Sequence, residues 1–107
     1  MYKLCFYVPE THLESVKTAV LATGAGKVGD YDSCCWQVLG QGQFRPLQGS
    51  KPFLGQQGEV EVVAEYRVEL VCEGAVVRAA VDALIEAHPY ETPAWDEVAL
   101  VTELPQK

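Results

Sequence analysis

The chain has 107 residues, close to the commonest size of a single domain. Its 15 acidic residues outnumber the 8 basic ones and give a net charge of -7, so it lacks the basic footprint that nucleic acids and anionic membranes require. It shows no signal-peptide pattern and no apolar run long enough for a membrane span. We therefore expect one cytoplasmic domain over residues 1–107.

The first part of the chain predicts a strand, a helix and a turn. Apolar residues alternate over 2–8, as in a strand with one buried face, and Pro9 ends the pattern. Thr11 and Glu14 match a capping box and apolar residues follow at helical spacing, which predicts a helix over about 11–23. The glycine-rich run 24–30 follows this helix instead of opening it, so a turn is favoured over a phosphate-binding loop.

The middle of the chain predicts two strands separated by a long excursion. Alternation over 31–39 predicts the first strand, and the excursion, rich in Gly, Gln and Pro, covers about 40–58. Loops of this length are usually functional or partly disordered. Residues 59–73 alternate more clearly than any other segment, which predicts an antiparallel strand. Because one straight strand of that length exceeds a compact domain, we expect a bend or bulge near 63–65 to split it. The first half would then pair with the excursion, which a strand extension and hairpin would explain.

The last part of the chain predicts a helix and a final strand. Pairs of apolar residues four apart predict an amphipathic helix from Gly74 to His88. Pro89 sets its end, because the residue before a proline disfavours helical geometry. Residues 94–104 predict a strand that is apolar on both faces.

The order of these elements predicts the fold class. Strand, helix, strand, strand, helix, strand is the α+β, ferredoxin-like βαββαβ pattern, in which two helices cover one face of a four-stranded antiparallel sheet. The last strand then lies at a sheet edge, where unpaired backbone is a liability. An edge strand that is apolar on both faces predicts a homo-oligomer.

The four cysteines are predicted to be structural thiols. Cys5, Cys34, Cys35 and Cys72 show no metal-ligand spacing such as C-x-x-C. Each lies in an apolar, strand-like pattern, where a reduced cysteine behaves as a small hydrophobic residue. We therefore predict neither a disulfide nor a zinc site.

Five short segments, in this order and spacing, carry a resemblance to a known family. They are VGDYDSC at 28–34, GQGQFRP at 40–46, PFLG at 52–55, GEVE at 58–61 and HPYE at 88–91. Together they resemble the inserted PII-like/CutA-like domain of the NGG-interacting-factor-three family, also named GTP cyclohydrolase I type 2. The resemblance covers nearly the whole chain. The HPYE motif alone is less specific, because CutA-type divalent-cation tolerance proteins carry a similar one.

The resemblance implies a stand-alone small domain, similar to trimeric PII-like folds, with a regulatory, ligand-sensing or assembly role. It favours a homo-oligomer, with a trimer preferred to a dimer. The family's dimetal site is built from histidines and carboxylates of another domain, and this chain has only His12 and His88. The cyclohydrolase-type activity attached to the family name is therefore not carried over to this chain.

The densest group of candidate functional residues lies just after the second helix. His88 and Glu91 are candidate ligands of a divalent metal, with Tyr90 or Asp96 nearby and the remaining ligands from a neighbouring chain. Alternatively, His88 caps the helix, Tyr90 packs at an interface, and the segment delivers Trp95 and the last strand to that interface. We favour this structural interpretation, since two ligands from one chain do not close a metal site.

Two classes of function follow. The favoured class is a non-enzymatic regulatory or structural module that oligomerises and binds a small ligand or metal between subunits. Arg45 in the excursion is a further ligand or interface candidate, and an interlocking arm is preferred there to an anion site. The alternative is a metal-dependent hydrolase that uses His88, Glu91 and Asp96. The scarcity of histidine and the lack of a recognisable catalytic set count against it.

Overall fold

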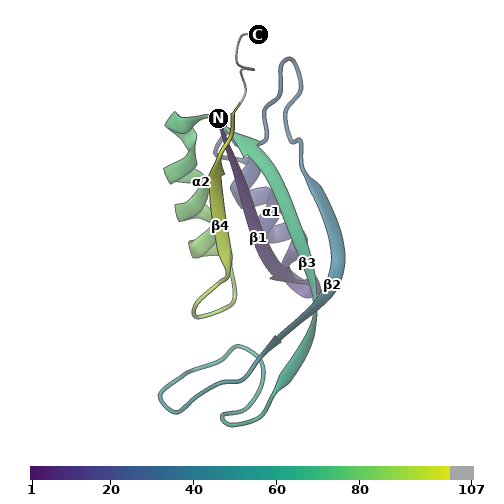
Figure 1. The fold of residues 1–107 in the computed structure, drawn as a ribbon, viewed down its shortest axis with the longest axis vertical. Coiled ribbons are helices and arrows are strands. Elements are labelled where there is room, and N and C mark those ends of the chain that lie inside the picture. Colours follow the sequence, from purple (N-terminus) through teal and green to yellow (C-terminus); the bar gives the residue numbers. More distant parts are fainter. Residues whose placement is uncertain (102–107) are drawn as a thin grey trace.

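Four antiparallel strands form one sheet in the computed structural model of the protein, which describes residues 1–101. The sheet order is β2-β3-β1-β4, and the two helices lie on one side of the sheet (Figure 1). This arrangement confirms the predicted ferredoxin-like α+β fold. The elements are β1 (Tyr2–Pro9), the 3-10 turn η1 (Glu10–His12), α1 (Leu13–Leu21), β2 (Trp36–Phe44), β3 (Glu61–Cys72), α2 (Gly74–Ala87) and β4 (Trp95–Ala99).

The core lies between the sheet and the two helices. Alternate residues of β1 and β3 point into it, as the strand alternation predicts, and they meet the apolar stripes of both helices. Each fully buried aliphatic or aromatic side chain stabilises the fold by about 1.5–3 kcal/mol relative to its exposed state. The largest of these residues are Leu4, Phe6, Val8, Val16, Val20, Val68 and Leu84.

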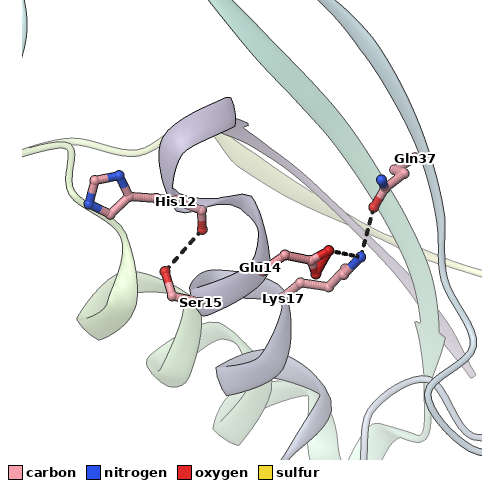
Figure 2. Close-up of polar contacts among 5 residues, drawn as sticks. All are labelled: His12, Glu14, Ser15, Lys17 and Gln37. Carbon is pink, nitrogen blue, oxygen red and sulfur yellow. Dashed lines mark hydrogen bonds and ion pairs between the residues drawn. The ribbon is translucent and has the colours of Figure 1, made fainter.

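The start of the first helix differs from the sequence prediction. Thr11 does not cap the helix, because its hydroxyl forms a hydrogen bond with Nδ1 of His12 at 2.8 Å. The 3-10 turn over Glu10–His12 takes up the first predicted helical turn, so α1 begins only at Leu13. No side chain caps the start of α1: the Ser15 hydroxyl donates to the His12 carbonyl at 3.1 Å and does not accept from a backbone amide there (Figure 2).

Lys17 attaches the first helix to the sheet. Its Nζ lies 3.1 Å from the Glu14 carboxylate, one helical turn earlier, and 3.0 Å from Oε1 of Gln37 on β2 (Figure 2). Glu14, which the capping box would have directed to the backbone, is therefore used in a side-chain pair. The hydrogen bond from Lys17 to Gln37 links α1 to β2.

The second strand starts and ends later than the alternation predicted. Residues 24–35 form a turn, as the glycine run indicates, and hydrogen bonds hold it to the fold: the Gly26 amide donates to the Val71 carbonyl, and the Cys34 amide donates to the Gly26 carbonyl, both at 2.8 Å. Cys34 and Cys35 therefore lie in a loop, and not in a strand as predicted. All four thiols are free, with Cys5 and Cys72 buried in the sheet.

The third strand is not split by a bulge, although its ribbon curves near the end of β1 (Figure 1). β3 runs unbroken from Glu61 to Cys72 and pairs with β2 in continuous register from Trp36↔Glu69 to Phe44↔Glu61. The expectation of a split assumed a compact domain, but the molecule is 54 Å long, because β2 and β3 continue past the end of β1 at Pro9↔Glu65. The first part of β3 pairs with the start of the excursion, as expected. We call residues 40–64 the arm: the projecting ends of both strands and the loop 45–60 that joins them (Figure 1).

The end of the chain follows the prediction in part. α2 spans Gly74–Ala87 and stops before His88, as Pro89 indicates. β4 pairs with β1 alone at the sheet edge, and it covers only Trp95–Ala99 of the predicted 94–104, of which 102–104 lie outside the described residues. Over residues 1–101, no helix is long and apolar enough to cross a membrane.

Candidate functional site

A pocket of about 270 Å³ lies where the arm meets the turn between α2 and β4. Figure 1 shows the loop of the arm curving towards this turn. We call this hollow the arm pocket. Its lining residues come from the ends of β2 and β3 (Gln43, Phe44, Glu65), from the loop of the arm (Pro46, Ser50, Pro52, Phe53, Leu54) and from the turn (Tyr90, Glu91, Thr92, Ala94).

His88 holds the turn against the sheet behind the pocket. Its side chain is only 7% exposed, and Nε2 lies 2.7 Å from the carbonyl of Tyr7 on β1. Nδ1 accepts a hydrogen bond from the amide of Tyr90 at 3.1 Å. An imidazole that donates from Nε2 and accepts at Nδ1 is neutral. Burial lowers the pKa of His88, although the hydrogen bond to Tyr7 opposes this effect.

Tyr90 joins the turn to the third strand. Its hydroxyl donates to Oε2 of Glu65 at 2.8 Å. Burial, followed by the hydrogen bond to Glu65, raises the pKa of Tyr90 far above its usual value, so the phenol stays protonated and keeps donating. The Glu65 carboxylate can lie across β2 only because Gly42 has no Cβ there: an added Cβ would overlap the carboxylate.

Aromatic contacts dock the loop of the arm onto the body of the domain. Phe53 packs edge-on against His12 with ring centroids 5.2 Å apart, and its ring lies 6.4 Å from that of Tyr90. Phe44 lies 5.9 Å from Tyr90 on another side. The Lys51 amide lies 3.3 Å from each oxygen of the Glu91 carboxylate. Tyr90 is therefore at the centre of the contacts that shape the pocket.

Comparison with known proteins places this chain among relatives that are much longer. No family model matches it. The protein named GTP cyclohydrolase 1 type 2 homolog of Mycobacterium leprae is 48% identical over 99 residues, which are 92% of this chain and 26% of that protein. The corresponding protein of Bacillus subtilis is 45% identical over 94 residues, or 88% of this chain and 25% of that protein.

Two solved structures have folds similar to that of this chain. A Bacillus cereus protein related to NIF3 superposes with a TM-score of 0.79 and 35% identity over 92% of this chain and 25% of that one. The chain is homologous to one segment of the NIF3-related proteins. CutA from Xylella fastidiosa, at 20% identity and a TM-score of 0.68, covers 97% of this chain and 86% of its own, and shows the same fold. The predicted resemblance is confirmed, and the chain spans about a quarter of its curated relatives.

In this NIF3-related segment, three of the predicted site residues come together. His88, Tyr90 and Glu91 lie on the same turn, with Tyr90 and Glu91 lining the arm pocket and His88 behind them. Both ring nitrogens of His88 are used in hydrogen bonds within the chain, so binding a metal there would break one of them. In the described part of the chain, no group of three or more His, Cys, Asp or Glu side chains is placed to hold a metal ion.

The other predicted residues lie elsewhere. Asp96 pairs with Cys5, and Trp95 pairs with Phe6, so both belong to the edge strand β4. Arg45 is exposed at the start of the loop of the arm and does not line the pocket. The two parts of segment 88–96 therefore lie in different places: the turn contacts the arm, and Trp95 and Asp96 belong to the sheet.

Sequence reasoning missed several residues that form the pocket. Phe44 and Phe53 are isolated aromatic residues in a polar segment, a pattern that indicates docking of the segment on another surface. Glu65 was one of several acidic residues at alternate positions, and nothing local distinguishes it from Glu61 or Glu69. Its importance depends on Tyr90, 25 positions further along the chain.

A pair of glycine substitutions tests the Tyr90–Glu65 contact. Gly42→Ala should push the Glu65 carboxylate away and cost about 1 kcal/mol of the free energy of unfolding, in line with the loss of one hydrogen bond. It should also bring the pKa of Tyr90 back towards its usual value, as measured by ultraviolet titration of the phenol. Gly40→Ala is the matched control on the same strand, where an added Cβ meets nothing within 4 Å. Equal effects of the two variants would contradict this account.

Proposed function

We propose that the chain is a homo-oligomeric regulatory or structural module, with three subunits, that binds a small ligand in the arm pocket. The observation that carries the proposal is the side of the sheet opposite the helices, here called the open face. Residues paired across neighbouring strands point to the same side. Trp36 pairs with Glu69, whose neighbours Val68 and Leu70 are buried in the core, so Trp36 and Glu69 point away from the helices.

The open face carries large apolar side chains in contact with water. Trp36 is 61% exposed and Val38 is 44% exposed, both on β2. On β4, Val98 pairs with Lys3 and is 52% exposed. An exposed tryptophan and two exposed valines on one face of a sheet are typical of a surface that another protein covers.

The charges on the open face favour a second copy of the chain as the partner. Arg67 Nη2 lies 2.7 Å from one oxygen of Glu69, and Lys3 Nζ lies 3.8 Å from the other. Both signs of charge are thus present beside the apolar residues, and a symmetric interface can match positive groups of one copy with negative groups of the next. The edges formed by β2 and β4 also become less exposed in a closed assembly.

The resemblance to PII-like folds supports three subunits in preference to two. A trimer surrounds its axis with three copies of the same face, so that each Trp36 is covered by a neighbour. The residues that line the arm pocket all come from one chain, so the pocket forms without a contribution from a second subunit.

A metal-dependent hydrolase receives less support. It would rest on His88, Glu91 and Asp96, yet both nitrogens of His88 are engaged and Asp96 pairs with Cys5 on another strand. Glu91 accepts from the Lys51 amide and lines the arm pocket. The geometry therefore favours binding and assembly as the role of this region.

Native mass spectrometry of the purified chain tests the proposed assembly. We expect a species of about three times the 11.7 kDa subunit, and sedimentation at micromolar concentration should give the same stoichiometry. A dimer would refute the subunit number but keep the assembly. A monomer at these concentrations would contradict the proposed function.

A further inference from the structure

We propose that the arm pocket binds a small organic cation, that is, an ammonium or guanidinium group carried by a short apolar body. The inference rests on the ligand-binding role proposed above and names the chemistry of the ligand. It follows from three properties of the pocket: its charge, its aromatic walls and its size.

The charge of the pocket is negative. Glu65 and Glu91 are the ionisable carboxylates that line it, and no lysine or arginine is among its lining residues in the described chain. Glu65 receives one hydrogen bond, from a neutral phenol, which leaves its negative charge uncompensated. An anion would therefore be repelled, and a cation would supply the missing charge.

The walls of the pocket are aromatic and apolar. Phe44 and Phe53 flank Tyr90 with ring centroids 5.9 and 6.4 Å from it, so one positive group can lie near more than one ring. Aromatic faces attract ammonium and guanidinium groups within about 6 Å of the ring centroid. Pro46, Pro52 and Leu54 add surface for the hydrocarbon part of such a ligand.

Size and ligand type exclude two other occupants. At about 270 Å³ the pocket is smaller than the roughly 300–1,000 Å³ of sites for drug-sized ligands, so it suits a small amine or one side chain better than a nucleotide. A bare metal ion requires several oxygen, nitrogen or sulfur ligands that converge on one point. The lining of this pocket is instead largely apolar. Neither His12 nor His88 lines the pocket, and both ring nitrogens of His88 are already hydrogen-bonded.

The cationic group could belong to a free amine or to a lysine side chain. Isothermal titration calorimetry with a charged probe for each source, and an uncharged probe of matching shape, distinguishes the two. Isopentylammonium represents the free amine, with isopentanol as its uncharged match. Nα-acetyl-lysine methylamide represents the side chain, with the norleucine derivative as its uncharged match. We expect at least one cation to bind with one site per chain, and its neutral match to bind at least about 10-fold more weakly. The tighter of the two cations identifies the source.

Glu65→Gln tests the role of the charge without removing the acceptor for the Tyr90 hydroxyl. We expect it to weaken binding of the cation by about 10- to 100-fold, the range for losing a charge-assisted contact. Glu86→Gln, exposed on α2 and absent from the pocket lining, is the matched control and should bind like the unmodified chain. Equal binding of a cation and its neutral match, no saturable binding of either cation, or an unchanged affinity in Glu65→Gln would overturn the inference.

Sedimentation of the same samples keeps this inference separate from the proposed assembly. A trimer that binds neither cation would refute the cation site alone. A monomer that binds a cation and loses affinity with Glu65→Gln would refute the assembly alone.

Discussion

Replacing His88 with alanine is expected to lower the free energy of unfolding by about 2–4 kcal/mol, which is a large share of the stability of a small domain. The buried ring joins β1 to the turn after α2 through the Tyr7 carbonyl and the Tyr90 amide. Without it, both backbone groups lose their partners and a cavity replaces the imidazole. Urea unfolding at about pH 7.5 measures the loss.

His12→Ala is the control for this variant, because it removes the other imidazole, which packs edge-on against Phe53 and forms one side-chain hydrogen bond with Thr11. We expect it to cost about 1 kcal/mol or less, the value of one exposed hydrogen bond and a partial packing contact. Losses of equal size in the two variants would show that His88 is not the main link between strand and turn.

The effect of pH provides a second measurement on His88. Burial lowers its pKa in the folded state, so below about pH 6.5 the unfolded chain takes up a proton that the folded chain resists. Stability should therefore fall as the pH decreases from about 6.5 towards the lowered pKa of the folded state. In His88→Ala this part of the slope should disappear, whereas His12→Ala should retain it. The same slope in all three proteins would contradict a neutral, buried His88.

Replacing Trp36 with lysine is expected to weaken self-association by at least about 30-fold, corresponding to the loss of one interface hot-spot residue. Lysine at position 36 lies opposite Glu69, so the isolated subunit gains a favourable cross-strand pair and keeps its fold. At the interface, however, the charge would be buried in place of a large aromatic ring. Sedimentation over a range of concentrations measures the change.

Leu39→Lys is the matched control for the assembly prediction. Leu39 lies on the same strand, is 52% exposed and pairs with Tyr66, which packs against the core, so it points to the helix side of the sheet. We expect this variant to associate like the unmodified chain. If Leu39→Lys dissociates the assembly and Trp36→Lys does not, the open face is not the surface that joins the subunits.

Some features of the site were encoded locally and could be predicted from the sequence. Pro89 ends α2 because its ring disfavours helical geometry at His88, whatever the rest of the chain does. The alternation around Val68 and Leu70 identified the buried face of β3, because side chains in a strand alternate between two sides. The segments that resemble the NIF3-related proteins were likewise sufficient to predict the fold.

Other features depend on residues that are far apart in the sequence. The capping box failed because the Thr11 hydroxyl forms a hydrogen bond with its neighbour His12, a competition that local spacing does not resolve. β2 and β3 stay paired along the arm beyond the end of β1, so the radius expected of a compact domain does not limit their length.

The segment from His88 to Trp95 shows the division most clearly. The sequence by itself determined that a helix ends there, that a strand follows, and that imidazole, phenol and carboxylate groups are concentrated between them. Only the tertiary structure decided what these groups do. His88 is neutral because its two nitrogens meet Tyr7 and Tyr90, and the pocket exists because the arm brings Phe53 back to Tyr90. Protonation state and pocket shape are set by these long-range neighbours, which sequence spacing does not specify.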